Sequence, residues 1–153
     1  MPGKIVDDRC SIARTVAVVG ERWSLLIVRD ALRGASTFSD FRGRLGIPSD
    51  VLSARLATLT EGGVFAKVAY REPGERERFR YELTDSGRGL LPVLAAMVQW
   101  GDHNNPLPDG PTSVLAERGS GTPLRVAFVD EAGHEVRPED ARLAPGPAAR
   151  STW

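Results

Sequence analysis

The sequence has little cysteine and no long apolar run, and each shortage excludes a class of protein. Its single cysteine, Cys10, cannot form a disulfide within the chain, which fits a reducing compartment. No apolar run approaches the roughly 20 residues that a membrane-spanning helix needs. The first ten residues, MPGKIVDDRC, lack the apolar segment of a secretory signal. We therefore expect a cytoplasmic protein with no membrane partner.

The sequence also lacks the motifs of common enzymes. It contains no glycine-rich phosphate loop, no HExxH and no CxxC. The two histidines, His103 and His134, fall in or beside expected turns, and with one distant thiol they do not have the spacing of a zinc site. Acidic pairs fall in expected loops without apolar surroundings. We therefore expect no catalytic residue, no metal and no cofactor.

The net charge is zero, yet the charges are unevenly distributed. Residues 42–80 carry 8 basic and 5 acidic side chains, whereas residues 106–153 carry 5 basic and 7 acidic ones. A modest basic excess favours specific docking on nucleic acid over strong nonspecific attraction. The excess alone is a weak signal, because surface charges are usually only solvated.

The first part of the chain has the apolar periodicity of helices separated by glycine-containing turns. We expect four helices, over residues 10–19, 23–32, 39–45 and 50–61. The segment Gly46-Ile47-Pro48 makes the turn between the third and the fourth. Ser39 and Ser49 are expected to cap these two helices, since a serine hydroxyl accepts a bond from a free backbone N–H.

The fourth expected helix has two different faces. Leu52, Leu56 and Leu59 are spaced by four and three residues, and this stripe packs inward. The opposite face presents short hydroxyl side chains and one arginine: Ser49, Ser53, Arg55 and Thr58. Such side chains suit close approach to base edges and phosphates, so this helix is predicted to enter the major groove of DNA.

A β-hairpin and a long helix are expected next. Residues 64–70 and 78–83 have the β-branched and aromatic content of strands, and Pro73-Gly74 is a turn dipeptide. A helix over residues 86–100, capped by Thr84-Asp85, then carries a broad apolar band. Such a band suggests burial against both its own domain and a partner.

The remainder of the chain is expected to form an appendage. Asn, Pro and Gly are dense in residues 101–111, so we expect one domain over residues 1–105 and an extension over 106–153. In the extension we expect a helical turn at 112–118 and a β-hairpin at 124–137. This hairpin either covers a dimer or effector pocket or is a flexible ornament, so a small-molecule effector stays an open alternative.

The expected fold class is mainly α with a small antiparallel β wing, and the segments that form it match a known family. They cover about residues 10–101 in order: Cys10–Arg14, Gly20–Trp23, Leu32–Gly34, Phe38–Phe41, Leu52–Leu56, Leu59, Gly63–Val64, Tyr81–Thr84, Gly87, Leu91–Leu94 and Trp100–Gly101. In these segments the chain resembles the HxlR-type transcriptional regulators, a bacterial winged helix-turn-helix family. The resemblance implies a homodimer that binds palindromic operator DNA, and we expect this regulator to act as a repressor.

Site residues follow from the pattern and the resemblance together. The predicted DNA contacts lie on the two short helices and the wing: Ser39, Arg42, Arg44, Ser49, Ser53, Arg55, Thr58, Lys67, Arg76, Arg78 and Arg80. The predicted dimer contacts lie on the first and last helices of the domain: Ile12, Val16, Leu91, Leu94, Met97, Val98 and Trp100.

Alternatives stay open for several of these residues. Arg55 could instead pair with an acidic side chain, and Glu75 and Glu77 could neutralise the arginines of the wing. The wing sequence from Pro73 to Arg78 also departs from the family pattern, so the wing contacts are weaker predictions than the helix contacts. The alternative function is a ligand-sensing protein–protein module that uses the winged fold without DNA.

Cys10 is a separate hypothesis. It opens a helix with Arg9 and Arg14 nearby, which is the setting of a reactive thiol. The resemblance implies a redox role, because some members of the family sense oxidants through a cysteine at this position. The alternative is a small buried residue. With no second cysteine, sensing needs a disulfide to a partner subunit, a small-thiol adduct or alkylation.

Overall fold

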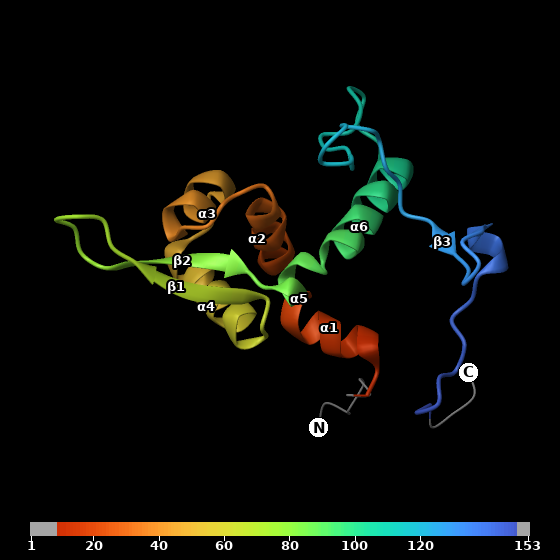
Figure 1. Ribbon diagram of the computed structural model, residues 1–153, viewed down its shortest axis with the longest axis horizontal. Coiled ribbons are helices and arrows are strands. Elements are labelled where there is room, and N and C mark those ends of the chain that lie inside the picture. Colours follow the sequence, from red (N-terminus) through yellow and green to blue (C-terminus); the bar gives the residue numbers. More distant parts are fainter. Residues whose placement is uncertain (1–8, 150–153) are drawn as a thin grey trace. The chain divides into compact units, whose positions relative to one another are not determined.

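The fold is that of a computed structural model, which describes residues 9–149 of the chain (Figure 1). The chain forms two compact units, the first extending to Leu94 and the second starting at Ala95. This division falls within a helix, whereas the sequence analysis places a boundary after residue 105. The domain boundary at that position stays a prediction.

The first unit is built on four helices. They are α1 (Ser11–Val19), α2 (Arg22–Leu32), α3 (Phe38–Leu45) and α4 (Ser49–Glu61). The predicted inward stripe of α4 is confirmed, because Leu52, Leu56 and Leu59 are buried with Ile27 of α2 and Phe41 of α3. Burying each such side chain stabilises the fold by about 1.5–3 kcal/mol, so this stripe fixes the orientation of α4.

The starts of α3 and α4 differ from the predictions. Thr37 caps α3: its Oγ1 accepts from the N–H of Asp40 at 3.1 Å, and Asp40 Oδ2 accepts from the N–H of Thr37 at 2.9 Å. Pro48 is the N-cap of α4, without a side-chain cap bond. The predicted caps Ser39 and Ser49 are therefore wrong. Each helix begins one residue earlier than expected, which places both serines inside a first turn.

The predicted hairpin is present as an antiparallel pair. Strand β1 (Phe65–Tyr70) pairs with β2 (Arg78–Leu83) in a register that joins Phe65 to Leu83 and Tyr70 to Arg78. The N–H of Tyr81 donates to the carbonyl of Ser36 at 2.7 Å, so β2 also holds the segment that enters α3. Figure 1 shows the hairpin turn protruding from the helical part of the unit.

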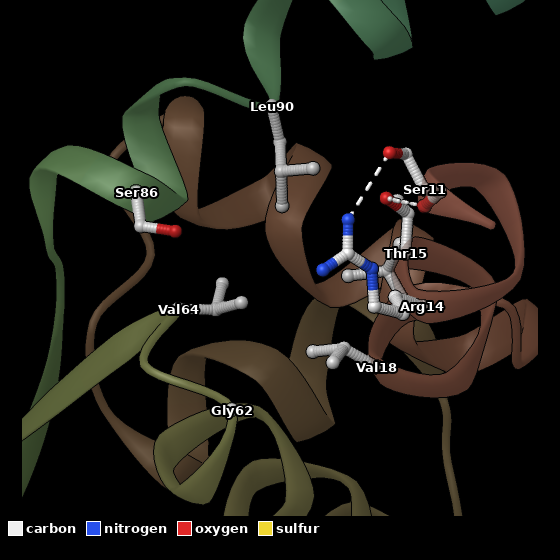
Figure 2. A pocket seen from close by; sticks show the side chains of 9 residues that line it. Ser11, Arg14, Thr15, Val18, Gly62, Val64, Ser86 and Leu90 are labelled. Atoms are coloured by element: carbon white, nitrogen blue, oxygen red, sulfur yellow. Dashed lines mark hydrogen bonds between the residues drawn. The ribbon is translucent and has the colours of Figure 1, made fainter. Parts of the chain in front are cut away.

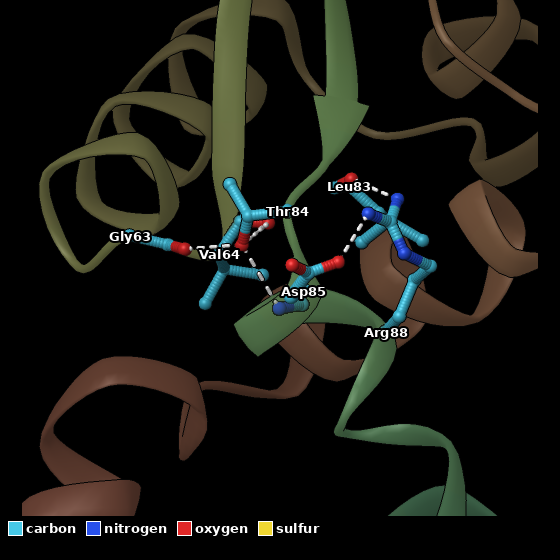
Figure 3. A network of polar contacts seen from close by, with 7 residues as sticks. Gly63, Val64, Leu83, Thr84, Asp85 and Arg88 are labelled. Carbon is cyan, nitrogen blue, oxygen red and sulfur yellow. Dashed lines mark hydrogen bonds and ion pairs between the residues drawn. The ribbon is translucent and has the colours of Figure 1, made fainter.

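The predicted helix over residues 86–100 is wrong, because two helices occupy this region. They are α5 (Asp85–Arg88) and α6 (Leu91–Asn104). Pro92 explains the break, since its ring would clash with the carbonyl four residues earlier in a continuous helix. The predicted cap is confirmed: the Thr84 hydroxyl accepts from the N–H of Gly87 at 3.0 Å and donates to the carbonyl of Gly63 at 2.6 Å (Figure 3).

The second unit has almost no core of its own. It contains β3 (Phe128–Val129), β4 (Glu135–Val136) and the short 3-10 helix η1 (Pro138–Asp140). Among its described residues only Ala95 is buried. The side-chain amide of Gln99 pairs with the backbone of Val126, accepting from its N–H at 3.0 Å and donating to its carbonyl at 3.2 Å. These two bonds attach the extension to α6.

The extension also differs in detail from the sequence expectation. The hairpin expected at 124–137 is present with strands of only two residues each. The helical turn expected at 112–118 is wrong, because this segment is extended and Ala116 forms a β-bridge with Pro123. The N–H of Leu124 donates to the carbonyl of Leu115 at 2.8 Å, so the backbone groups here bond across a loop instead of along a helix.

Candidate nucleic-acid interface

The turn between α3 and α4 fixes which side of α4 is outward. Gly46 ends α3 with a φ of 60°, a left-handed conformation that glycine adopts without strain. The next residue, Ile47, is 2% exposed and anchors the turn in the core. Pro48 then precedes α4, and its ring restricts the backbone at the entry to that helix. The arrangement is a helix-turn-helix with the leucine stripe of α4 inward.

The outward side of α4 carries the predicted hydroxyl groups. Ser49 and Ser53 are exposed, and Arg55 and Thr58 are half-buried at its edges. The Thr58 hydroxyl donates to the carbonyl of Ala54 at 3.0 Å, which leaves its lone pairs to accept a bond. No acidic side chain in residues 9–149 pairs with Arg55, so the alternative that it serves an ion pair finds no partner in this part of the chain.

Sequence reasoning missed three exposed positions on α4. Asp50, Ala54 and Ala57 are exposed, and at 100° per residue they lie opposite the leucine stripe. The two alanines have no hydrogen-bonding side chain, although a methyl group can contact the methyl of thymine. The helical period itself was the signal that could have found them. Asp50 adds a carboxylate to the first turn.

Helix α3 contributes exposed cations beside α4. Ser39, Arg42 and Arg44 are exposed, and Arg44 Nη1 donates to the carbonyl of Arg33 at 3.3 Å. The backbone N–H groups of Ser36 and Thr37 hold the pKa of Asp40 below its ordinary value. The one carboxylate of α3 is thus engaged by the backbone at the start of the helix. In residues 9–149 Arg42 has no partner.

Two cations of the wing lie over aromatic rings. Lys67 Nζ lies 4.2 Å from the centroid of the Phe79 ring, and Arg80 Cζ lies 4.5 Å from that of Tyr70. Arg78 pairs with Glu75 at 2.7 Å, so the alternative of neutralisation by a glutamate holds at this position.

The tip of the wing is neutral overall. Residues 71–78 contain three arginines and three glutamates. Arg76 is exposed and has no ion pair with any residue in 9–149. Of the basic side chains of the wing only Arg78 forms an ion pair within residues 9–149, so cations without an ion pair lie both on the wing and on the helices α3 and α4.

The predicted dimer residues are mostly exposed. Ile12 and Val16 of α1 are exposed, and the exposed members on α6 are Leu91, Met97, Val98 and Trp100. Leu94 differs, because it packs against the core of the first unit. Cys10 is exposed at the N-cap of α1, so it is not the buried residue of the alternative interpretation.

A cavity lies within each of the two units. In the first unit a cavity of about 340 Å³ lies between α1, the turn from α4 to β1, and the segment of α5 and Leu90 (Figure 2). In the second unit a cavity of about 280 Å³ lies between α6 and the extension. Within residues 9–149 no three His, Cys, Asp or Glu side chains gather as metal ligands would, and no helix is long and apolar enough to cross a bilayer.

Known proteins of similar sequence and structure are transcriptional regulators. The chain is 36% identical to the uncharacterized HTH-type transcriptional regulator Rv3095 of Mycobacterium tuberculosis over 92% of this chain and 89% of that protein. The crystal structure of PA1607, a candidate transcription factor, has 38% identity and a TM-score of 0.79, covering 92% of this chain and 97% of that one. The oxidized form of the redox regulator HypR has 27% identity and a TM-score of 0.56, covering 64% of this chain and 100% of that one.

The family assignment follows from these similarities and the observed fold. The profile of the HxlR-like helix-turn-helix family matches residues 18–108, which include α2 to α6 and the wing. The resemblance expected from the sequence is therefore confirmed. The chain belongs to the HxlR-like helix-turn-helix family of transcriptional regulators.

Proposed function

We propose that the protein binds a palindromic operator as a homodimer and represses the adjacent gene. The observation that carries this proposal is the difference between the two sides of α4: its leucines are buried in the core, and its serines and alanines are exposed. In the proposed complex α4 enters the major groove, α3 crosses the DNA backbone, and the wing flanks the adjacent groove.

The side chains divide between phosphate and base contacts. Arg42, Arg44 and Arg76 are exposed cations at the edges of the surface and contact phosphates, which set the register. The base contacts come from the outward side of α4: Ser49, Ser53, Ala54, Arg55, Ala57 and Thr58.

The homodimer is inferred from apolar side chains that the monomer leaves in water. Ile12 is 62% exposed on α1, and Trp100 is 69% exposed on α6. Aromatic side chains that become buried commonly dominate protein interfaces. Two copies joined through these helices hold their α4 helices about 34 Å apart, one turn of B-DNA. DNA binding of this kind places the protein in the cytoplasm.

Footprinting of the purified protein on genomic fragments tests the proposal. We expect protection of a palindrome, and we expect Arg55→Ala to weaken binding to it by about 1–3 kcal/mol. Arg118→Ala is the matched control, because Arg118 lies in the extension and its loss should not change the affinity. Absence of any protected site, or equal loss in both variants, would refute the assignment of α4 as the recognition helix.

Cys10 supports a second, regulatory candidate. Its exposure at the start of α1 leaves the sulfur accessible, and the chain is similar to the redox regulator HypR. If the thiol is a sensor, diamide changes the operator affinity of the wild type and leaves Cys10→Ser unchanged. An unchanged gel shift of the wild type under diamide removes this candidate.

A further inference from the structure

The cavity of the first unit contains a single charge. Among the described residues that line it, the guanidinium of Arg14 is the only ionised group, and none is a carboxylate. Its volume of about 340 Å³ falls at the lower end of the roughly 300–1,000 Å³ of small-molecule sites. The charge of the cavity therefore favours an anion, and its volume favours a small molecule.

Apolar side chains form the interior walls. Val18 of α1, Val64 at the start of the hairpin and Leu90 before α6 point into the space from three directions (Figure 2). Val64 is 3% exposed, so this wall is part of the core. A fully hydrated ion would gain no binding free energy from contact with these apolar walls. A ligand with an apolar group would gain it, because that group would be removed from water in the cavity.

Polar groups lie at the rim. Arg14 Nη2 donates to the Ser11 hydroxyl at 3.1 Å, which holds the guanidinium beside the opening (Figure 2). A guanidinium has five N–H donors, so four remain for a ligand. The Ser86 hydroxyl also borders the cavity, and it has no partner in residues 9–149. A planar carboxylate matches this set, because arginine binds it through two parallel bonds.

We propose that this cavity binds a small monocarboxylate with an aromatic or branched aliphatic body. The carboxylate pairs with Arg14 and accepts from Ser86, and the body contacts Val18, Val64 and Leu90. A singly charged ligand is favoured over a phosphate ester, since the cavity offers one guanidinium, at its rim, to balance one negative charge.

The site also joins two elements that matter for DNA binding, and this step rests on the proposed function. Its walls come from α1, which carries proposed dimer contacts, and from Gly62, which ends α4. A Cβ at position 62 would lie 2.5 Å from Val18 Cγ1, so α1 and the end of α4 are already in close contact. A ligand between them changes the placement of α4 relative to the dimer helix, and with it the operator affinity.

Calorimetry on the DNA-free protein tests the site directly. The probe is 2-naphthoate, and 2-naphthamide has the same body without the charge. We expect the acid to bind, and the amide to bind weaker by about tenfold or more. Arg14→Gln should weaken the acid by a similar factor, whereas Arg118→Gln, the same charge change in the extension, should have no effect. Equal binding of acid and amide, or an unaffected Arg14→Gln, would overturn the proposal.

A second variant removes space without removing charge. Ser86→Leu extends an apolar side chain from an exposed position into the cavity. We therefore expect it to lower the affinity for both 2-naphthoate and 2-naphthamide and to leave the melting temperature of the protein unchanged. Unchanged binding in this variant would place the probe elsewhere and contradict the site.

Operator binding is measured separately in the same samples. A change in operator affinity with saturating 2-naphthoate supports coupling between the cavity and DNA binding. An unchanged operator affinity overturns that coupling, and calorimetry still shows whether the cavity binds the probe. Failure of the unliganded protein to bind any operator would instead refute the proposed function, so the two failures are distinguishable.

Discussion

Gly87 lies against the carbonyl of Val64 so closely that a Cβ at position 87 would be 2.3 Å from that oxygen. The contact brings α5 onto the first residues of the hairpin. Thr84 strengthens the same junction, because its N–H donates to the Val64 carbonyl at 3.1 Å. The wing and α5 therefore meet at one tightly packed point (Figure 3).

Gly87→Ala should destabilise the first unit. The added methyl group has to displace backbone atoms, and overpacking of this kind costs about 1–3 kcal/mol. Urea unfolding followed by circular dichroism measures the loss. Gly43→Ala is the control, since Gly43 is helical and its Cβ would meet nothing within 4 Å. Equal stability of the two variants would mean that the junction at Val64 is looser than described.

Thr37→Ala should lower the free energy of unfolding by about 1 kcal/mol, the usual effect of losing an N-cap. Ser39→Ala should be nearly neutral, because Ser39 lies within α3 and makes no cap bond. Chemical denaturation of the two variants compares their free energies of unfolding directly. The opposite order of stabilities would restore Ser39 as the cap.

The capping carboxylate predicts a pH dependence. The N–H groups of Ser36 and Thr37 lower the pKa of Asp40 below its ordinary value of 3.8. The ionised form is therefore favoured by folding, so its contribution is present above pH 3.8 and is lost as the pH falls through the lower pKa of the folded state. We expect the stability difference between the wild type and Asp40→Asn to shrink as the pH falls below 3.8. A constant difference from pH 6 to about pH 2 would contradict this.

Gln99→Ala should loosen the extension without unfolding the first unit. Gln99 accepts from the Val126 N–H at 3.0 Å, and each such bond contributes about 0.5–1.5 kcal/mol. Hydrogen exchange should show faster exchange at the Val126 amide. Asn104→Ala is the matched control, because Asn104 donates within α6 to the carbonyl of Trp100. Equal exchange in wild type and Gln99→Ala would show that other contacts hold the extension.

Apolar periodicity predicted the elements that pack on a core. The spacing of Leu52, Leu56 and Leu59 was sufficient to orient α4, since these positions are decided by burial. The sequence does contain the signal for the cap of α3, because Thr37 and Asp40 have the spacing of a capping box, and the prediction of Ser39 overlooks it. The break between α5 and α6 was hidden by a continuous apolar band.

The second unit was harder to predict for a physical reason. Its strands have two residues each, too few for an alternating pattern, and it buries almost nothing within residues 95–149. The bonds that organise it join distant groups, such as Gln99 and Val126, and leave no local trace in the sequence. Cavities depend on packing between elements, so neither cavity wall could be assigned from spacing alone.

The proposed function depends on DNA binding by α4 and the cations beside it. The most direct test is the salt dependence of binding to the protected operator duplex. The logarithm of the affinity should fall linearly with the logarithm of the salt concentration, with a slope of about −0.9 for each phosphate neutralised. We expect a slope of several units, reduced by about 1 in Arg42→Gln. A ligand-sensing protein–protein module would not bind duplex DNA at any salt concentration, and that result would contradict the claim.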